Sequence, residues 1–206
     1  MWPFRPKTGS GMNLANRLTL LRWALVPVFM IFTVLDNFWT RVLALLIFAA
    51  ASLTDAYDGY IARKYNEVTE FGKLMDPLAD KFLISAAFIC FIKMRELDVA
   101  PWMVVLIFGR ELLVTGLRLL AASKGQVLSV DRQGKFKTII QMTVVISILL
   151  ILCANSFLRQ FTDLSPPHIL GSSPYWLVFI SMVATLYSGT LYLYRNRHLY
   201  MQDVGL

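Results

Sequence analysis

Residues 54–82 read "TDAYDGYIARKYNEVTEFGKLMDPLADKF". This stretch carries four aspartates, Asp55, Asp58, Asp76 and Asp80, in a chain in which 57% of the residues are hydrophobic. An acidic side chain at the centre of a membrane helix costs about 2.5–3.5 kcal/mol, so four acids close together require an explanation. They must either lie outside the lipid or be held by a cation.

The four aspartates form two pairs with helical spacing. Asp55 and Asp58 are three residues apart, and Asp76 and Asp80 are four apart. Either spacing puts both carboxylates of a pair on one face of a helix. If the two helices pack antiparallel, the four carboxylates meet and repel one another unless a divalent cation lies between them. Because ligands that are all oxygen suit Mg²⁺ or Mn²⁺, we expect a metal site here; the alternative is a set of solvated loop acids.

The neighbouring residues favour a phosphate ligand beside the metal. Gly59 and Gly72 leave no side chain where a ligand approaches the helices. Arg63 supplies a planar cation that suits phosphate. A metal with open coordination positions is often completed by substrate phosphate oxygens, so the segment predicts a site for a di- or triphosphate.

The rest of the chain has the composition of a membrane protein. With 57% hydrophobic and only 16% charged residues, the chain is neither disordered nor an ordinary soluble domain. About twenty apolar residues cross a membrane as a helix, and no alternating pattern typical of a β-barrel is present. We therefore expect an all-α integral membrane protein with six transmembrane helices. The apolar segments span residues 18–35, 40–61, 77–94, 99–123, 137–156 and 174–194.

The sequence predicts one membrane domain, over residues 12–206, after a flexible tail at residues 1–11. No internal repeat, low-complexity tract or linker divides it. The segment "NLANRLTLLRWALV" at residues 13–26 interleaves asparagine and arginine with leucine. This is typical of an interfacial helix that leads into the first span; the alternative is a polar start to the first helix itself.

Charge predicts the orientation in the membrane and the class of partner. The net charge is +7, and with six crossings the basic residues concentrate on the side that holds both termini and the aspartates. An excess of lysine and arginine marks the cytoplasmic face of the inner membrane. Because the basic residues flank apolar runs without forming one continuous patch, we expect membrane lipids or an anionic substrate as partners, and no nucleic acid.

The aspartate segment also resembles a known family. The pattern Asp55-x2-Asp58-Gly59-x2-Ala62-Arg63-x8-Gly72-x3-Asp76-x3-Asp80 is similar to the full motif of the CDP-alcohol phosphatidyltransferases. Members of that family are six-helix membrane enzymes, usually homodimers, that use an acceptor hydroxyl to displace CMP from a CDP-linked lipid or alcohol.

The resemblance implies a role for each motif position. It implies that Asp55, Asp58 and Asp76 bind the metal, and that Asp80 is a metal ligand in part and the general base. It further implies that the CDP-diacylglycerol site includes the residues that match the remaining positions. These are Gly59, Ala62, Arg63, Thr69 and Gly72.

A second group of charges predicts where an acceptor binds. Arg110, Glu111 and Arg118 interrupt the fourth apolar segment. The two arginines are about 12 Å apart along a helix axis, and arginines at such depth usually face the bundle interior or a wet cavity. Lys135 and Lys137 open the fifth span on the same side. We expect these four cations to bind an acceptor's own phosphate; the alternative for Arg110 is an internal ion pair with Glu111.

The stretches "NLANRLTLLR", "GRELLVTGLR" and "GKFKTIIQM" resemble the family members whose acceptor is sn-glycerol 3-phosphate. The expected reaction transfers the phosphatidyl group from CDP-diacylglycerol to that acceptor and releases CMP. An inositol phosphate acceptor is the alternative within the family, whereas serine carries no phosphate for the basic residues. A divalent-cation transporter is the alternative from another class. Transporter sites lie near the membrane midplane, often between repeats, while these acids lie at helix ends.

Overall fold

A computed structural model of the chain describes residues 14–65, 70–123, 132–162 and 168–197. Within these ranges it leaves out the side chains of residues 14–19, 55–65, 70–80, 122–123, 132–133, 135 and 168–171. In the described residues the chain forms six α-helices and one short 3-10 helix. They are α1 (Leu14–Val34), α2 (Phe38–Tyr65), α3 (Glu70–Lys93), η1 (Arg95–Leu97), α4 (Pro101–Ser123), α5 (Arg132–Phe161) and α6 (His168–Arg195). Each predicted apolar segment thus coincides with part of one helix, with at most two residues of the segment beyond the helix end.

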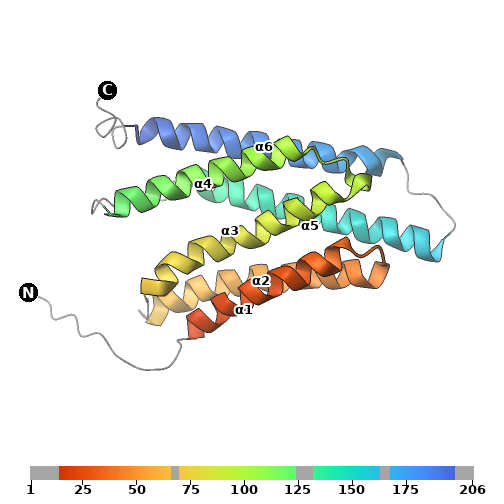
Figure 1. Cartoon of the computed structure of the whole chain (residues 1–206), viewed down its shortest axis with the longest axis horizontal. Coiled ribbons are helices and arrows are strands. Elements are labelled where there is room, and N and C mark those ends of the chain that lie inside the picture. Colours follow the sequence, from red (N-terminus) through yellow and green to blue (C-terminus); the bar gives the residue numbers. More distant parts are fainter. Residues whose placement is uncertain (1–13, 66–69, 124–131, 163–167, 198–206) are drawn as a thin grey trace, which may run out of the picture.

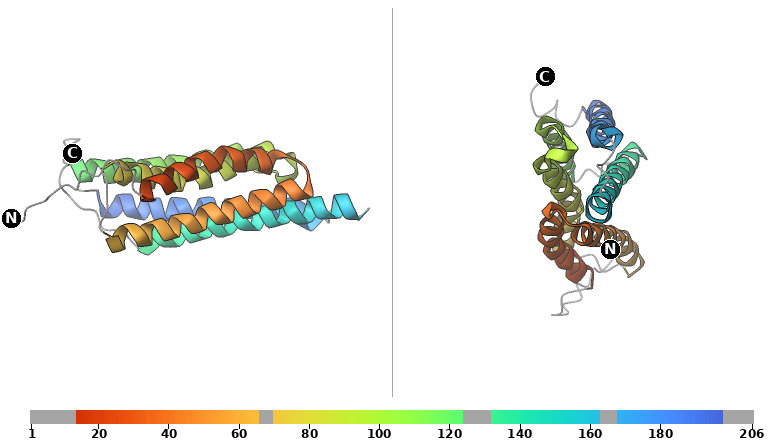
Figure 2. Two further views of the ribbon diagram at one scale, coloured as in Figure 1. Left: turned by 90° about the horizontal axis from the view of Figure 1, so that it is seen from below. Right: turned by 90° about the vertical axis from the view of Figure 1, so that its right-hand side faces the viewer.

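The helices lie side by side along one long axis, as Figures 1 and 2 show. α1 packs on α2 and α3, α5 packs on α2 and α6, and α4 packs on α6. Large apolar side chains fill the space between them. The largest fully buried ones are Phe29, Phe48, Phe88, Phe91, Leu97, Met103, Ile148, Leu149 and Leu152.

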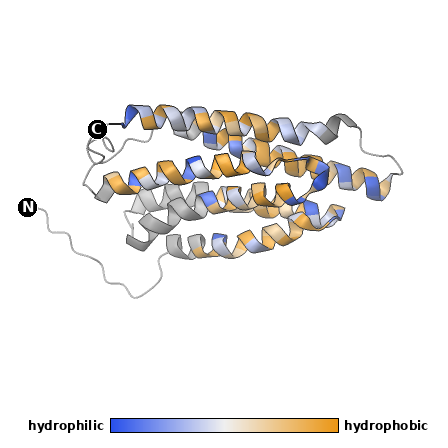
Figure 3. Ribbon diagram, turned by 45° about the horizontal axis from the view of Figure 1, so that its top comes forward, coloured by the Kyte–Doolittle hydropathy of each residue, from blue (hydrophilic) through white to orange (hydrophobic). Residues whose placement is uncertain are grey.

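The outer surface of the bundle is apolar as well. Figure 3 shows that hydrophobic residues predominate along the middle of the bundle. Val105, Leu112 and Leu113 on α4 are each about two-thirds exposed, at 66%, 65% and 64%. Soluble monomers rarely expose continuous apolar surface on this scale. Among the described residues, Phe136–Phe161 and Ser172–Arg195 are long and apolar enough to cross a membrane. These features indicate a membrane protein.

α4 is not apolar enough to be counted with these two segments, because it contains charged residues that point inward. Any eighteen consecutive residues of α4, about the length needed to cross a membrane, include Arg110, Glu111 and Arg118. Arg110 and Glu111 are nevertheless buried, with exposed fractions of 7% and 8%. The charges therefore lie inside the bundle while leucines cover the outer face of the same helix.

The predicted separate interfacial helix is wrong for the described residues. α1 runs without interruption from Leu14 to Val34. Residues 14–26 contain neither glycine nor proline, so nothing in that stretch breaks the helix before Pro27. The alternative, a polar start to the first helix, describes this segment.

Charges at the end of the bundle where α2 begins pair with one another. Arg41 is buried, with an exposed fraction of 3%. Its Nη2 lies 3.0 Å from Asp36 Oδ1 and 2.5 Å from Glu96 Oε1. Its Nη1 donates a hydrogen bond to the carbonyl of Leu152 at 3.1 Å. Arg159 pairs with the same two acids, at 3.7 and 3.2 Å. This network ties α2, η1 and α5 together at the end opposite the aspartates.

Candidate functional site

The four aspartates of the motif lie on two helical segments that follow one another in the chain. Asp55 and Asp58 belong to the C-terminal half of α2, and Asp76 and Asp80 to the first half of α3. The helical backbone keeps both members of each pair on one helix face. Only residues 66–69 separate the two helices, so both pairs lie at the same end of the bundle (Figure 1).

The predicted metal and nucleotide ligands lie outside the described side chains. Gly59, Ala62 and Arg63 are on α2 and Gly72 is on α3, while Thr69 lies outside the described residues altogether. Among the side chains that are described, no group of three or more His, Cys, Asp or Glu residues is suited to hold a metal ion. The roles assigned to the motif residues therefore stay predictions.

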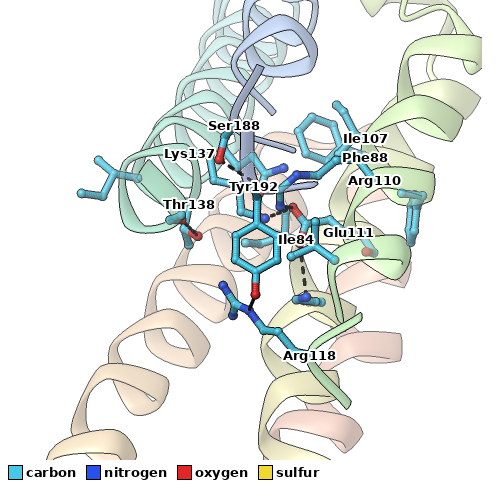
Figure 4. A pocket seen from close by; sticks show the side chains of 17 residues that line it. Ile84, Phe88, Ile107, Arg110, Glu111, Arg118, Lys137, Thr138, Ser188 and Tyr192 are labelled. Atoms are coloured by element: carbon cyan, nitrogen blue, oxygen red, sulfur yellow. Dashed lines mark hydrogen bonds and ion pairs between the residues drawn. The ribbon is translucent and has the colours of Figure 1, made fainter. Parts of the chain in front are cut away.

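A cavity of about 340 Å³ opens between α3, α4, α5 and α6 (Figure 4). Lys81, one of its lining residues, directly follows Asp80, so the cavity begins one residue from the aspartate segment. Apolar side chains such as Ile84, Phe88 and Ile107 form part of its lining. The charged and polar residues that line it are Lys81, Ser85, Arg110, Glu111, Arg118, Lys137, Thr138, Gln141, Ser188 and Tyr192.

Glu111 connects three of the four cations in the cavity. Its Oε1 accepts a hydrogen bond from Lys137 Nζ and lies 3.4 Å from Arg110 Nη1, and its Oε2 lies 3.4 Å from Lys81 Nζ. Glu111 and Lys137 are both 8% exposed. A buried carboxylate is tolerated when it is paired and hydrogen-bonded, and here the three cations come from three different helices.

Residues of α6 contact the two arginines. Arg110 Nη2 donates to Ser188 Oγ at 3.0 Å. Arg118 Nε donates to Tyr192 Oη at 3.4 Å, and its guanidinium carbon lies 5.3 Å from the centre of the Tyr192 ring. Figure 4 shows Tyr192 pointing toward Arg118 across the cavity.

The described lining carries a formal excess of positive charge. Lys81, Arg110, Arg118 and Lys137 face a single carboxylate, Glu111. Since charge-assisted hydrogen bonds from arginine and lysine to phosphate are among the stronger protein contacts, this arrangement suits a small anion with several negative oxygens. The cavity is thus a basic pocket that begins next to the predicted metal site.

The structure brings together three of the four cations predicted to bind an acceptor phosphate. Arg110, Arg118 and Lys137 line one cavity, while the side chain of Lys135 is not among those described. The alternative interpretation of Arg110 is also found, because Arg110 does pair with Glu111. The pair does not remove Arg110 from the lining, and the predicted binding role is left untested.

The sequence did not predict three of the residues that line the cavity, Lys81, Ser188 and Tyr192. Lys81 lies one residue beyond Asp80 and so faces a different direction on the helix from that aspartate. Ser188 and Tyr192 are four residues apart in a largely apolar helix, a spacing that places them on one face. Two polar side chains on one face of such a helix were the available signal.

The family profile described as CDP-alcohol phosphatidyltransferase matches residues 12–187 of this chain. The chain belongs to the CDP-alcohol phosphatidyltransferase family. The match includes the aspartate segment and the cavity residues of α3, α4 and α5, and it ends one residue before Ser188.

Several relatives in this family have closely similar sequences. The Bacillus subtilis (strain 168) protein named CDP-diacylglycerol--glycerol-3-phosphate 3-phosphatidyltransferase is 45% identical over 151 residues, which cover 67% of this chain and 77% of the relative. The Rickettsia typhi protein of the same name is 38% identical over 176 residues, covering 85% and 94%. A Mycobacterium tuberculosis (strain H37Rv) protein named probable phosphatidylglycerophosphate synthase is 45% identical over 137 residues, covering 65% and 64%.

Proposed function

We propose that the chain transfers the phosphatidyl group of CDP-diacylglycerol to sn-glycerol 3-phosphate, giving phosphatidylglycerophosphate and CMP. The observation that carries this proposal is the basic cavity of Arg110, Arg118 and Lys137 next to the aspartate segment. An acceptor that brings its own phosphate needs such an anion pocket beside the reaction centre. The names of the relatives support the same acceptor.

The reaction divides the site into two parts. The CDP part is proposed to contact Gly59, Ala62, Arg63, Thr69 and Gly72. The acceptor phosphate is proposed to contact Arg110, Arg118, Lys135 and Lys137. Between them, Asp80 accepts the proton of the acceptor hydroxyl, whose oxygen forms the new bond to the β-phosphorus. The bond from that phosphorus to CMP breaks, and its electron pair leaves with CMP.

A divalent cation fits the chemistry of the aspartate donor set. Asp55, Asp58, Asp76 and Asp80 offer carboxylate oxygens only, on helical backbones that keep each pair on one face, and such oxygens suit Mg²⁺ or Mn²⁺. When bound, the cation supplies Lewis-acid stabilisation of charge on the phosphate oxygens. We expect turnover to stop in excess EDTA and to return on addition of Mg²⁺ or Mn²⁺. Full turnover in EDTA contradicts the metal assignment.

We further propose six membrane crossings by α1 to α6 in the inner membrane, with the aspartates and both termini toward the cytoplasm. The proposed membrane domain covers residues 12–206, while the tail predicted at residues 1–11 lies outside the described residues. The enzyme works as a homodimer, as the family resemblance implies. The orientation is supported by the paired charges at the opposite end, where Arg41 and Arg159 are offset by Asp36 and Glu96.

The test is an assay of the purified protein in detergent with CDP-diacylglycerol and Mn²⁺ or Mg²⁺. Release of CMP is measured with glycerol 3-phosphate, inositol phosphate and serine as acceptors. We expect glycerol 3-phosphate to give the highest kcat/KM. A preference for inositol phosphate contradicts the acceptor and keeps the family. We set the transporter alternative aside because the relatives reported above are named as transferases or synthases.

A further inference from the structure

The C-terminal part of α6 forms one wall of the basic cavity. Ser188 and Tyr192 line the cavity, and Gly189 lies between them in the helix. Ser188 and Tyr192 are 6% and 5% exposed, so both are enclosed by the bundle. Neither side chain carries a charge, and each contacts one arginine of α4. The wall thus contacts the two arginines of the basic cavity through uncharged groups.

Gly189 provides the space in which Arg110 lies. A Cβ atom added at Gly189 would be 2.5 Å from Arg110 Cγ and 2.7 Å from Arg110 Nε, closer than real Cβ contacts. The missing side chain therefore lets the stem of Arg110 lie directly against the backbone of α6. In that position the guanidinium reaches Ser188 Oγ at 3.0 Å and Glu111 Oε1 at 3.4 Å.

Tyr192 holds Arg118 in a different way. Among the described residues, Arg118 has no carboxylate partner, unlike the other three cations of the cavity. Its recorded contacts are the hydrogen bond to Tyr192 Oη and the face of the same ring, both neutral. Its Nη2 lies 3.8 Å from where a Cβ at Gly134 would be, an ordinary van der Waals distance, so the guanidinium lies beside the first turn of α5. A cation fixed by neutral partners keeps its charge available for a ligand.

We propose that α6 positions both arginines for the acceptor's phosphate, with Ser188 and Gly189 seating Arg110 and Tyr192 orienting Arg118. This inference rests on the proposed function. Ser188, Gly189 and Tyr192 are positioning residues that act through the arginines and have no part in the chemistry at the β-phosphorus. Their loss should raise the KM for glycerol 3-phosphate, with little change in the KM for CDP-diacylglycerol.

The first test compares two tyrosines of the same helix. Tyr192→Phe removes the hydroxyl that accepts from Arg118 and keeps the ring, so we expect the KM for glycerol 3-phosphate to rise about tenfold, the lower end for a hydrogen bond to a charged group. Tyr194→Phe is the matched control, because Tyr194 is 64% exposed and its ring contacts Arg197 instead. The control should change the same KM by less than about twofold.

The second test uses the glycines. Gly189→Ala places a methyl group against Arg110, whereas Gly116→Ala on α4 adds one where no atom lies within 4 Å. We expect only Gly189→Ala to raise the KM for glycerol 3-phosphate. If the methyl acts through Arg110, the double variant with Arg110→Ala should have the KM of Arg110→Ala alone, which is the non-additivity expected of residues in contact. Additive effects would overturn the seating role of Gly189.

Two outcomes separate this inference from the function on which it rests. If the unaltered protein does not use glycerol 3-phosphate, the proposed function fails, and the inference with it. If the unaltered protein uses that acceptor but Tyr192→Phe leaves its KM unchanged, or raises both substrates' KM equally, the positioning role alone is overturned. Calorimetric titration of each variant with glycerol 3-phosphate, without CDP-diacylglycerol, provides a second measurement of binding. Tyr192→Phe decides the matter if Gly189→Ala does not fold.

Discussion

Glu111 is a single carboxylate placed among cations, and its position explains how the basic cavity is stable without a ligand. Lys81, Arg110 and Lys137 would repel one another in a buried space. The carboxylate lowers that repulsion and fixes the three cations relative to one another. At the same time the cavity keeps a net positive charge, so a phosphate still finds favourable partners.

Removing this carboxylate should cost stability. In Glu111→Gln the three cations lose their counter-charge, and breaking a buried ion pair from one side costs about 3–5 kcal/mol. We expect a clearly lower melting temperature in detergent. Asp98→Asn is the matched control, since Asp98 is exposed and asparagine tolerates its positive φ of 48°. An unchanged melting temperature for Glu111→Gln would mean that the ion pairs contribute nothing to stability.

Asp80 is predicted to remove the proton of the acceptor hydroxyl. Asp80→Asn keeps the shape of the side chain and loses its basicity, so kcat should fall by about 10²–10⁴, the usual contribution of a general base. Binding of CDP-diacylglycerol should be largely retained. Because the same carboxylate is a predicted metal ligand, kcat must be measured at saturating metal, with metal affinity titrated beside it. A normal kcat under those conditions removes Asp80 from the role of base.

At the scale of elements, α3 joins the two halves of the proposed site. The aspartates of α3 precede Lys81 directly, and Lys81 reaches into the basic cavity, where its Nζ donates to the hydroxyl of Thr115 and pairs with Glu111. α3 thus carries a predicted metal ligand and a cavity cation one residue apart. The spacing between the predicted metal site and the basic cavity is therefore set within a single helix and does not depend on a loop.

Lys81→Ala should therefore affect the acceptor more than the nucleotide. We expect a rise of about tenfold in the KM for glycerol 3-phosphate, the lower end for a charge-assisted contact, because the Lys81 side chain is 28% exposed. Lys93→Ala, on an exposed position at the other end of α3, is the control and should leave both KM values unchanged. An equal loss for CDP-diacylglycerol would place Lys81 in the nucleotide site instead.

The helices could be predicted from the sequence because apolar runs of about twenty residues have few other structures open to them. Their ends could not. α2 continues to Tyr65 and α5 begins at Arg132, beyond the apolar segments at residues 40–61 and 137–156, because a formed helix extends through polar residues that keep its hydrogen bonds. In the site, charged residues inside apolar runs were visible in the sequence. Neutral partners such as Ser188 and Tyr192 gave a weaker signal, since both are common in apolar helices.

At the scale of the whole molecule, the two ends of the bundle differ in their chemistry. One end holds the aspartate segments, the basic cavity and the ends of α4 and α6 (Figure 1). The other holds the closed network of Arg41, Arg159, Asp36 and Glu96, with Trp39 and Trp102 exposed near the starts of α2 and α4 at 65% and 49%. Exposed tryptophans at helix ends are typical of a membrane interface. We infer that the two ends face opposite sides of the membrane.

Cysteine labelling tests this orientation. Arg95→Cys places a thiol at the network end and Arg197→Cys places one at the cavity end, both at exposed positions. In spheroplasts of a bacterial expression host, a membrane-impermeant maleimide should label Arg95→Cys at once and Arg197→Cys only after the membrane is permeabilised. The unaltered protein is the control, because Cys90 and Cys153 are 2% and 8% exposed and should react slowly.

Labelling of Arg197→Cys in intact spheroplasts would contradict the proposed topology. It would put the basic cavity outside the cytoplasm, away from a charged acceptor that does not cross the membrane. Labelling of both variants in intact spheroplasts would put the two positions on the same side of the membrane, which contradicts the three crossings proposed for α4, α5 and α6 between them.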